Sequence, residues 1–459
     1  MTIALGRAVT EAESSGGGIY LRNRTAEISH CIFKSNAALK GGAIYADSSI
    51  VRIRRTYFEG NSAASRGATF YVKRSEMSLD SCDIGPSAEI LPIDAYLGEF
   101  HLDAGNVSLC NSLIHDIGQT APGSRNIFWC FESFSSRQVR LKGCTIENCN
   151  LRTLAEGASN VSIFDLRMDS CLVRNNVIWW GFFLPWMNPR MQFASVTRNW
   201  FENNSYQPGT GGNGLLFFDQ DNRNFLCEEN YFLRNNLYSY ACLGLRTLSN
   251  ALLGRAQRNY FVENTSDGYP FDAGITVMLD RVQDSVFEYN ALIENEGYGV
   301  FSLDWFSPTS YALHNFWGDS TGPYEVTRNP GGLGDTTNAA TIYDEWLLSE
   351  DEIPDTSLFP PPNAADDRRW TVPSTWFISS IYPNPFNSGF RIELDGMTGA
   401  DFEVRLYDLL GREVALLHSG RTLRGALSFS APANLAAGIY FISAHDRFYS
   451  ETRKVLYLK

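Results

Sequence analysis

The sequence predicts an all-β protein, a right-handed parallel β-helix of about eleven coils followed by a small C-terminal β-sandwich. Three observations support this prediction. The stretch GGGIYLRNRTAEISHCIFKSNAA at residues 16–38 nearly repeats, 25 positions later, as GGAIYADSSIVRIRRTYFEGNSA at residues 41–63. The repeat continues to residue 348 in short β-rich pieces separated by Gly, Asn and Ser. A Pro-rich stretch then precedes a tail of alternating apolar and polar residues.

A large apolar residue recurs once in each repeat unit. Steps of 23 to 32 residues, about 28 on average, separate successive copies. A β-sandwich or propeller with irregular strands is the alternative, but propeller blades usually need ~40 residues or more. One unit cannot bury its own apolar side, so stacked units share a continuous core. The recurring residues are Phe33, Phe58, Ile84, Ile114, Ile146, Val173, Phe201, Phe232, Phe261, Ile293 and Phe316.

An asparagine follows many of these apolar residues. Asparagine tolerates the left-handed backbone conformation, and its amide can hydrogen-bond to the same residue one coil away. A column of asparagines therefore suits a tight corner between stacked coils. The asparagines that lie three residues after the apolar residue are Asn36, Asn61, Asn176, Asn204, Asn235 and Asn264. Asn295 follows Ile293 by two residues.

Two sets of motifs in residues 16–348 resemble known families. The tetrapeptides GGGI, GGAI, FKSN, FEGN, FENN, FLRN and FVEN resemble the GGAI and FxxN repeats of chlamydial polymorphic outer-membrane proteins. That family places them on β-helical domains at the cell surface. The segment HNFWGDSTGPYEVTRNPGGLGD, residues 314–335, looks like the terminal segment of secreted, pectin-lyase-like β-helix proteins. Both resemblances imply an extracellular repeat shaft.

Composition narrows the possible partners. The net charge is −13 and no Lys/Arg block forms a basic face, so nucleic acid is not an expected ligand. No apolar run reaches the ~18 residues of a membrane-spanning helix. Residues 376–459 hold nine Lys/Arg and eight Asp/Glu, a net of +1, which leaves −14 on the remainder. Such an acidic shaft repels anionic polymers unless a cation bridges them.

The nine cysteines suggest packing and not metal binding. There is no CxxC pair, and Cys144 and Cys149 have no clustered His pair beside them, so we expect no zinc site. Cysteines stand two residues before the recurring apolar residue in several units, where a buried thiol acts as a small hydrophobe. Disulfides between adjacent coils remain an alternative. These cysteines are Cys31, Cys82, Cys144 and Cys171.

The chain changes character after residue 348. Residues 349–375 include SLFPPPNAADDRRW, which reads as a semi-rigid linker. In residues 376–459, the pieces FRIEL, FEVRLYD, GALSFS, GIYFISA and KVLYLK read as strands, and DLLGREV as a hairpin around Gly411. Five or more short strands in this span predict a small β-sandwich.

This tail closely resembles the type A sorting domain of the type IX (Por) secretion system. Four motifs carry the resemblance in order: YPNPFN, YDLLGREV, LAAGIYF and KVLYLK at the C-terminus. The strand GALSFS lacks a Trp that family members often have. The resemblance implies export across the outer membrane, often with removal of the tail and attachment to the cell surface. Its expected signal residues are Tyr382, Pro383, Asn384, Pro385, Gly411, Gly438, Lys454 and Lys459.

The amino terminus raises a conflict with this export route. Cargo of the type IX system first crosses the inner membrane with a signal peptide, and residues 1–15 do not read as one. They also form no complete coil. We therefore expect further coils and a signal peptide upstream, and association of the isolated chain through this end.

One outward column of the repeat is a candidate ligand site. If Ile19, Ile44, Phe70 and Phe100 point inward, then the residues that follow them point outward and stack. Asp165 and Asp219, with Asp221 nearby, are expected further along this column. Aromatic rings pack on sugars, and carboxylates bind Ca²⁺ or transfer protons. Simple support of the sheet is the preferred alternative. The stacked residues are Tyr20, Tyr45, Tyr71 and His101.

Catalytic signals are weak. Asp219 and Asp221 in FFDQDNR, with Arg223 as a base partner, are the best candidates for a calcium-dependent lyase or a hydrolase. No spaced Asp pair with Gly-His-Gly, GxSxG, Walker A or HExxH motif is present. The aromatic-rich stretch NVIWWGFFLPWMNPRMQF, residues 176–193, is expected to pack over the shaft or to form a binding platform.

The expected function is that of a secreted or surface-attached module that binds or adheres, without catalysis. The expected partners are the type IX secretion machinery and a polysaccharide or cell-surface glycan, outside a Gram-negative-type bacterium. The alternative is a polysaccharide lyase or glycoside hydrolase acting on a uronic-acid-rich or other polysaccharide. No cofactor is expected, except Ca²⁺ if the protein is a lyase.

Overall fold

A computed structural model describes most of the chain, which divides into two compact units, Met1–Pro360 and Pro361–Lys459. The expected linker falls largely in residues that the structure does not describe. The described residues are 1–8, 15–88, 97–119, 125–131, 137–157, 164–179, 181, 191–207, 214–218, 225–237, 242–246, 254–266, 273–282, 286–303, 310–354, 377–395, 401–408, 412–421, 425–431, 435–446 and 450–458.

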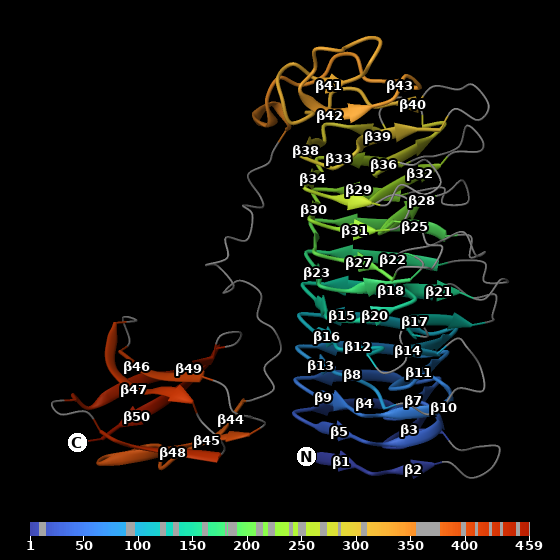
Figure 1. Ribbon diagram of the computed structural model, residues 1–459. Coiled ribbons are helices and arrows are strands. Elements are labelled where there is room, and N and C mark those ends of the chain that lie inside the picture. Colours follow the sequence, from blue (N-terminus) through green and yellow to red (C-terminus); the bar gives the residue numbers. More distant parts are fainter. Residues whose placement is uncertain are drawn as a thin grey trace. The chain divides into compact units, whose positions relative to one another are not determined.

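The first unit is a parallel β-solenoid, as predicted, with one turn of chain stacked on the next (Figure 1). Its longest sheet has eleven strands among the described residues, all parallel. In stacking order they are β1 (Thr2–Ala4), β5 (Ile32–Lys34), β9 (Tyr57–Glu59), β13 (Asp83–Ile84), β16 (Leu113–His115), β19 (Thr145–Glu147), β23 (Leu172–Arg174), β26 (Trp200–Glu202), β30 (Tyr231–Leu233), β34 (Tyr260–Val262) and β38 (Ala291–Ile293).

A second parallel sheet forms another side of each turn. It has ten strands within the described ranges, and we call it the ten-stranded sheet. They are β4 (Thr25–Ser29), β8 (Ile50–Arg54), β12 (Glu76–Asp80), β15 (Asn106–Cys110), β18 (Arg137–Lys142), β22 (Phe164–Asp169), β25 (Met191–Thr197), β29 (Phe225–Glu228), β33 (Arg255–Gln257) and β37 (Phe287–Glu288).

A third side consists of two six-stranded sheets in the part of the chain that is described. The first, which we call the aromatic sheet, contains β3 (Ile19–Arg22), β7 (Ile44–Asp47), β11 (Phe70–Lys73), β14 (Leu97–Asp103), β17 (Arg125–Phe131) and β21 (Thr153–Gly157). The second contains β28 (Leu216–Phe218), β32 (Leu243–Arg246), β36 (Ile275–Asp280), β39 (Tyr298–Ser302), β42 (Gly334–Thr337) and β41 (Pro323–Tyr324).

Short strands complete the turns. They form sheets of three, five and two strands among the described residues, and a single 3-10 turn, η1, spans Glu350–Glu352. The strands are β2 (Arg7–Ala8), β6 (Ala37–Lys40) and β10 (Ser62–Arg66); β20 (Asn150–Leu151), β24 (Val177–Ile178), β27 (Ser205–Tyr206), β31 (Asn236–Leu237) and β35 (Thr265–Ser266); and β40 (Ser310–Tyr311) and β43 (Thr341–Ile342).

The coil count is lower than the predicted eleven. Nine turns carry a described strand in each of the three main sides, and in a tenth, the turn of β25 and β26, only two of these sides carry a described strand. The prediction counted apolar residues, and the last of these, Phe316, lies in an isolated bridge beyond β38. Strand β1 pairs with β5 ahead of the first complete turn.

The apolar residues stack in the core as predicted for nine of the eleven units. Phe33, Phe58, Phe201, Phe232 and Phe261 are fully or almost fully buried, and successive phenyl rings lie about 5 Å apart.

The last two predicted core residues are wrong by one position. Phe261 pairs with Leu292, and Ala291 pairs with Phe316, so Leu292 and Trp317 point inward in place of Ile293 and Phe316. Because strand side chains alternate between faces, a shift of one residue turns each side chain to the opposite face. The shift also restores the three-residue spacing from Leu292 to Asn295.

The predicted asparagine column is present and buried. The Nδ2 of Asn204 donates to the Oδ1 of Asn235 at 2.9 Å and to the carbonyl of Val173 at 3.0 Å, while the Asn204 backbone N–H donates to the same Oδ1 at 3.1 Å. One side chain therefore satisfies backbone groups of the neighbouring turns. The same pattern runs through Asn176, Asn204, Asn235, Asn264 and Asn295.

The left-handed corner residue is not the asparagine itself. It is the residue before it, such as Ser35 (φ 55°), Asn203 (φ 53°) or Arg234 (φ 52°), and its type varies from turn to turn. The asparagine contributes its amide and not its backbone tolerance. The column ends at Asp335, which accepts from Asn295; burial raises the pKa of this carboxyl to about 7.

A second buried column at another corner was not predicted. Asn199, Asn230, Asn259, Asn290 and Asn315 are linked in the same way, each amide donating to the next. Toward the amino terminus the same register position is held by shorter side chains, and the backbone N–H of one turn donates to the side chain of the next: Cys31 to Thr56, Cys82 to Ser112 and Cys144 to Cys171. All nine cysteines are free, and eight are buried.

The second unit is the predicted small antiparallel sandwich. Two sheets share an apolar core that includes Phe390, Ile392, Val404, Leu406 and Ile442. One sheet, in the described ranges, contains β44 (Phe377–Tyr382), β45 (Gly389–Asp395) and β48 (Gly425–Ser430); the other contains β47 (Glu413–Arg421), β46 (Asp401–Tyr407), β49 (Gly438–Asp446) and β50 (Ser450–Tyr457). Strands β46 and β47 pair antiparallel, as the predicted hairpin requires.

A histidine on the eleven-stranded sheet lies between two carboxylates. The Nε2 of His115 is 3.0 Å from Asp83 and its Nδ1 is 2.7 Å from Asp116. Although burial of the ring opposes protonation, the two carboxylates raise the pKa of His115 to about 9. Gly85 leaves room for the imidazole, because a Cβ there would lie 3.2 Å from Nε2.

Replacing Asn235 by Ala should destabilise the solenoid. The change leaves the Asn204 backbone N–H and the Phe201 carbonyl without their side-chain partner, at a cost of ~2–3 kcal/mol. Urea unfolding followed by circular dichroism measures it. Asn203→Gly is the control, since this exposed left-handed position suits glycine and should change stability by less than ~0.5 kcal/mol. Equal stability of the two variants would contradict a stabilising role of the asparagine column.

Stability should fall as the pH rises through about 9. The pKa of His115 is above its ordinary value of 6.5, so its contribution is complete below pH 6.5 and disappears as the folded protein loses this proton. The loss is on the order of 3 kcal/mol. Urea unfolding between pH 6 and 10 measures it, and His115→Gln should flatten that part of the profile. An unchanged profile in this variant would refute the assignment.

Candidate functional site

The predicted aromatic column lies on the aromatic sheet. Tyr20 pairs with Tyr45, Tyr45 with Tyr71, and Tyr71 with His101. Their rings are stacked, with centroids 5.2, 5.0 and 4.7 Å apart. The register continues to Trp129. The sequence therefore identified both the residues of this column and their order.

Burial limits what this column can bind. Tyr20 is 49% exposed, but Tyr45, Tyr71 and His101 are 8%, 2% and 1% exposed. Burial and the charge of Asp47 raise the pKa of Tyr45 to about 12. A ring must present an open face or edge to contact a sugar, so Tyr20 is the member of the four with an accessible ring.

Asp165 does not belong to this column, which corrects its predicted position. It lies in β22 of the ten-stranded sheet, where it pairs with Gln138. Its carboxylate accepts hydrogen bonds from Arg167, with Nε at 3.1 Å. The prediction extended the column without aligning this unit strand by strand, and the register places Asp165 on a different side of the solenoid.

The other candidates cannot be placed. Asp219, Asp221 and Arg223 lie outside the described residues, so the structure supplies no geometry for a catalytic group there. Most of the aromatic-rich stretch 176–193 is also outside them. Its described Trp179 is half-buried, and the indole Nε1 donates to Asn150 at 2.7 Å.

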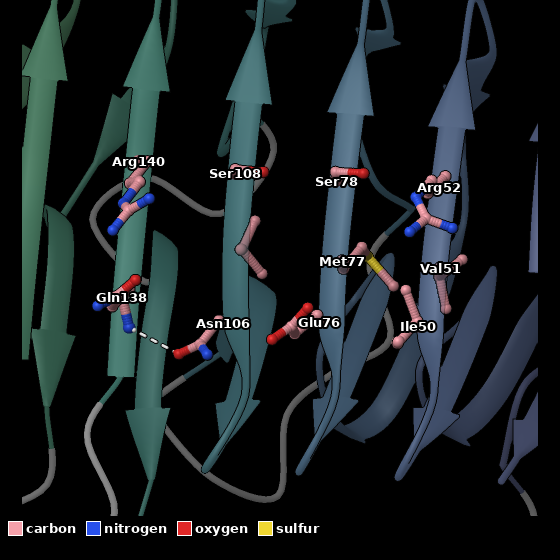
Figure 2. A pocket seen from close by; sticks show the side chains of 11 residues that line it. Ile50, Val51, Arg52, Glu76, Met77, Ser78, Asn106, Ser108, Gln138 and Arg140 are labelled. Atoms are coloured by element: carbon pink, nitrogen blue, oxygen red, sulfur yellow. Dashed lines mark hydrogen bonds between the residues drawn. The ribbon is translucent and has the colours of Figure 1, made fainter. Parts of the chain in front are cut away.

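The described surface is hollowed on the outer face of the ten-stranded sheet. A groove of about 240 Å³ crosses strands β8, β12, β15 and β18 (Figure 2). Strand alternation points Val51, Met77 and Val107 into the core and their neighbours outward. The outward side chains form two rows across the strands. One row holds Ile50, Glu76, Asn106 and Gln138, and the other holds Arg52, Ser78, Ser108 and Arg140.

Small side chains make the hollow. Ser78 and Ser108 occupy the two middle strands, while Arg52 and Arg140 stand on the strands to either side (Figure 2). The backbone N–H of Gln138 donates to the Oδ1 of Asn106 at 3.0 Å, which orients that amide. Hydroxyl, amide, carboxylate and guanidinium groups on a rigid sheet can together hydrogen-bond a polar ligand.

Sequence reasoning missed this groove. It followed the first strand of each unit, where aromatic residues stand out, and did not align the second strands IVRIR, EMSLD, NVSLC and RQVRLK. Alignment of those four strands would have predicted the outward row of Arg, Ser, Ser and Arg, because strand side chains alternate between faces and equivalent residues stack in register. A hollow between long side chains has no signature in any single segment.

Neither a cluster of metal ligands nor a membrane-spanning helix is found in the described part of the chain. No group of three or more His, Cys, Asp or Glu side chains there could hold a metal ion. None of its helices is long and apolar enough to cross a membrane.

The expected sorting residues gather at the last strand of the sandwich. Asn384 donates through Nδ2 to the carbonyl of Lys454 at 3.2 Å and accepts at Oδ1 from the backbone N–H of Leu456 at 2.9 Å. Phe386 continues the pairing along the same strand. Tyr382 is 45% exposed, and Gly438 begins β49, which pairs with β50. Gly411 and Lys459 lie outside the described residues.

This pairing explains why motifs far apart in the sequence occur together. The YPNPFN segment and the KVLYLK strand are about 70 residues apart, yet the first supplies hydrogen-bond partners for the second. Phe386 also packs its ring against Tyr457, with centroids 5.1 Å apart. The motifs are therefore parts of one structural unit.

Comparison with known proteins supports the same assignment. Residues 380–457 match the family described as Secretion system C-terminal sorting domain. A search of curated proteins finds no matching relative. The match covers the sandwich and none of the solenoid. The chain is thus a parallel β-solenoid that carries the C-terminal sorting domain of the type IX (Por) secretion system.

Proposed function

We propose that this protein is a surface-displayed binding module whose solenoid holds a polysaccharide in the groove of the ten-stranded sheet. Its sorting domain marks it for export by the type IX secretion system, so its ligands lie outside the cell. The groove is the observation that carries the proposal. It offers hydroxyl, amide and guanidinium groups from four adjacent strands, which suits a ligand with many hydroxyl groups.

The solenoid favours binding of a long ligand. Each strand of the sheet is hydrogen-bonded to its neighbours, so the outward side chains are spaced at about 4.8 Å and are held in position before the ligand arrives. Preorganisation reduces the entropy that binding costs. A row that crosses several strands can contact several consecutive units of one polymer.

The alternative function, a lyase or hydrolase, depends on Asp219, Asp221 and Arg223. Buried polar and charged groups within the described residues take part mainly in corners and ion pairs, such as His115 with Asp83. The groove itself contains one carboxylate, Glu76, whereas glycoside hydrolysis generally uses two. Binding without turnover is therefore the better-supported function.

Filling the groove should abolish binding. Ser108→Trp places an indole between Arg52 and Arg140, and we expect the affinity for a bound polysaccharide to fall at least about tenfold, or ~1.4 kcal/mol. Ser195→Trp is the matched control, because Ser195 lies in the same outward row of the same sheet but beyond the groove. Isothermal titration against a panel of polysaccharides measures both.

Two results would overturn this proposal. One is equal binding by the two Trp variants. The other is depolymerisation of a polysaccharide by the wild-type protein that Asp219→Ala abolishes, which would establish the enzyme instead.

Deleting residues 376–459 should stop export across the outer membrane without changing ligand binding by the solenoid. In the native host the truncated protein should remain in the periplasm, because the sorting domain is gone. Cell fractionation and surface labelling of intact cells measure this. As a control, the same residues fused behind a periplasmic reporter should bring the reporter to the surface. Normal surface delivery of the truncated chain would refute the role of the tail.

A further inference from the structure

Two basic ridges flank the groove. Arg52 and Arg54 point outward from β8, and Arg140 and Lys142 point outward from β18. The ridges are three strand spacings apart, roughly 14 Å. Between them the outward residues of β12 and β15 are mostly small, so the four cations face a common space.

These cations stand without an ion-pair partner among the described residues. The outward arginines on later strands differ: Arg167 pairs with Asp165, and Arg255 with Glu228. At the corners just beyond these strands, Arg198 pairs with Asp169 and Arg258 with Glu228. The same sheet therefore changes from paired to unpaired cations at the groove.

Two carboxylates, Glu76 and Asp80, lie between the ridges. Glu76 is the carboxylate that lines the groove, and no described side chain hydrogen-bonds to it. In the next outward row, Asp80 accepts from Ser81 at 3.3 Å and from Asn111 at 3.5 Å. Between the ridges, the four cations thus face two carboxylates, Glu76 and Asp80. On the outer sides of the ridges, Glu27 lies beside Arg52 and Asp169 beside Lys142 in register.

We infer that the groove recognises an acidic polysaccharide, one that carries carboxylate or sulfate groups, through Arg52 and Arg140. This inference rests on the proposed function, since it names the ligand class for the same groove. Guanidinium groups bind planar oxyanions with two parallel N–H donors. Ser78, Ser108, Asn106 and Gln138 supply donors and acceptors for the hydroxyl groups between the acidic ones.

Charge elsewhere on the solenoid helps to select this ligand. The net negative charge repels anionic polymers in general. Only a polymer that fits between the two ridges therefore gains more attraction from the cations than it loses by this repulsion. Nucleic acid binding needs a broad basic surface, whereas here the cations of the next turns beyond the basic ridges, such as Arg167 and Arg198, are paired with aspartates. A neutral polysaccharide would offer the two guanidinium groups hydroxyl oxygens but no opposite charge.

The test compares polygalacturonate with its fully methyl-esterified form, which has the same backbone without the charge. Dextran sulfate and neutral dextran form the second pair, so the two arms separate carboxylate from sulfate recognition. The variants are the double substitution Arg52→Gln and Arg140→Gln, the single substitution Glu76→Gln, and the control Arg167→Gln in the same row. The full chain is used throughout, and thermal melting checks that each variant is folded.

The expected results differ in sign between variants. The double substitution should weaken binding of the acidic polymer by roughly tenfold or more, because charged hydrogen bonds are lost. Glu76→Gln should strengthen it a few-fold, on the order of threefold, because it removes a repulsive charge. Arg167→Gln should have little effect, since Asp165 already neutralises that guanidinium. Affinity should also fall as salt is added.

Several results would overturn the inference. One such result is equal affinity for the charged and the uncharged form of a polymer, with Ser108→Trp abolishing the binding of both forms. It would support the groove as the binding site but refute recognition of acidic groups. A gain on Arg→Gln and a loss on Glu76→Gln would indicate a cationic ligand. Tighter binding of duplex DNA through the same arginines would replace polysaccharide by nucleic acid. No binding of any polysaccharide would refute the proposed function as well.

Discussion

The hydrogen bonds between equivalent residues of successive turns are the constraint on which the solenoid depends. At two corners these bonds run through buried asparagine amides, each bonded to the amide of the next turn and to a backbone carbonyl. A buried backbone group without a hydrogen-bond partner costs about 1–3 kcal/mol, so each corner must supply partners for its backbone groups. The ladders do this while the corner residues themselves vary between Ser, Asn, Arg and Glu.

This constraint turns a variable sequence into a regular surface. Insertions between strands change the length of a unit, but the ladders and the sheets return each turn to the same register. Equivalent side chains then form straight rows across the strands. The buried phenyl stack, the aromatic column of Tyr20, Tyr45 and Tyr71, and the groove of the ten-stranded sheet are three such rows.

The two units of the chain divide the work of the protein. The sandwich is the sorting domain, its YPNPFN segment is hydrogen-bonded to its last strand, and its net charge is close to zero. The solenoid carries the negative charge and, within it, the local excess of cations at the groove. The sorting domain and the groove that we propose to bind a ligand therefore consist of separate residues.

The sequence by itself determined the solenoid, the sorting domain and the identity of the aromatic column, because these depend on residues that recur at regular intervals or in contiguous motifs. It misplaced Ile293 and Asp165, because a face or side is decided by register, and one residue of offset reverses a strand's faces. Only the tertiary structure showed that Tyr45, Tyr71 and His101 are buried, and that Arg52, Ser78, Ser108 and Arg140 meet in a groove. Burial and hollows depend on what neighbouring turns place beside a residue, and those neighbours are about 25 to 32 positions away in the chain.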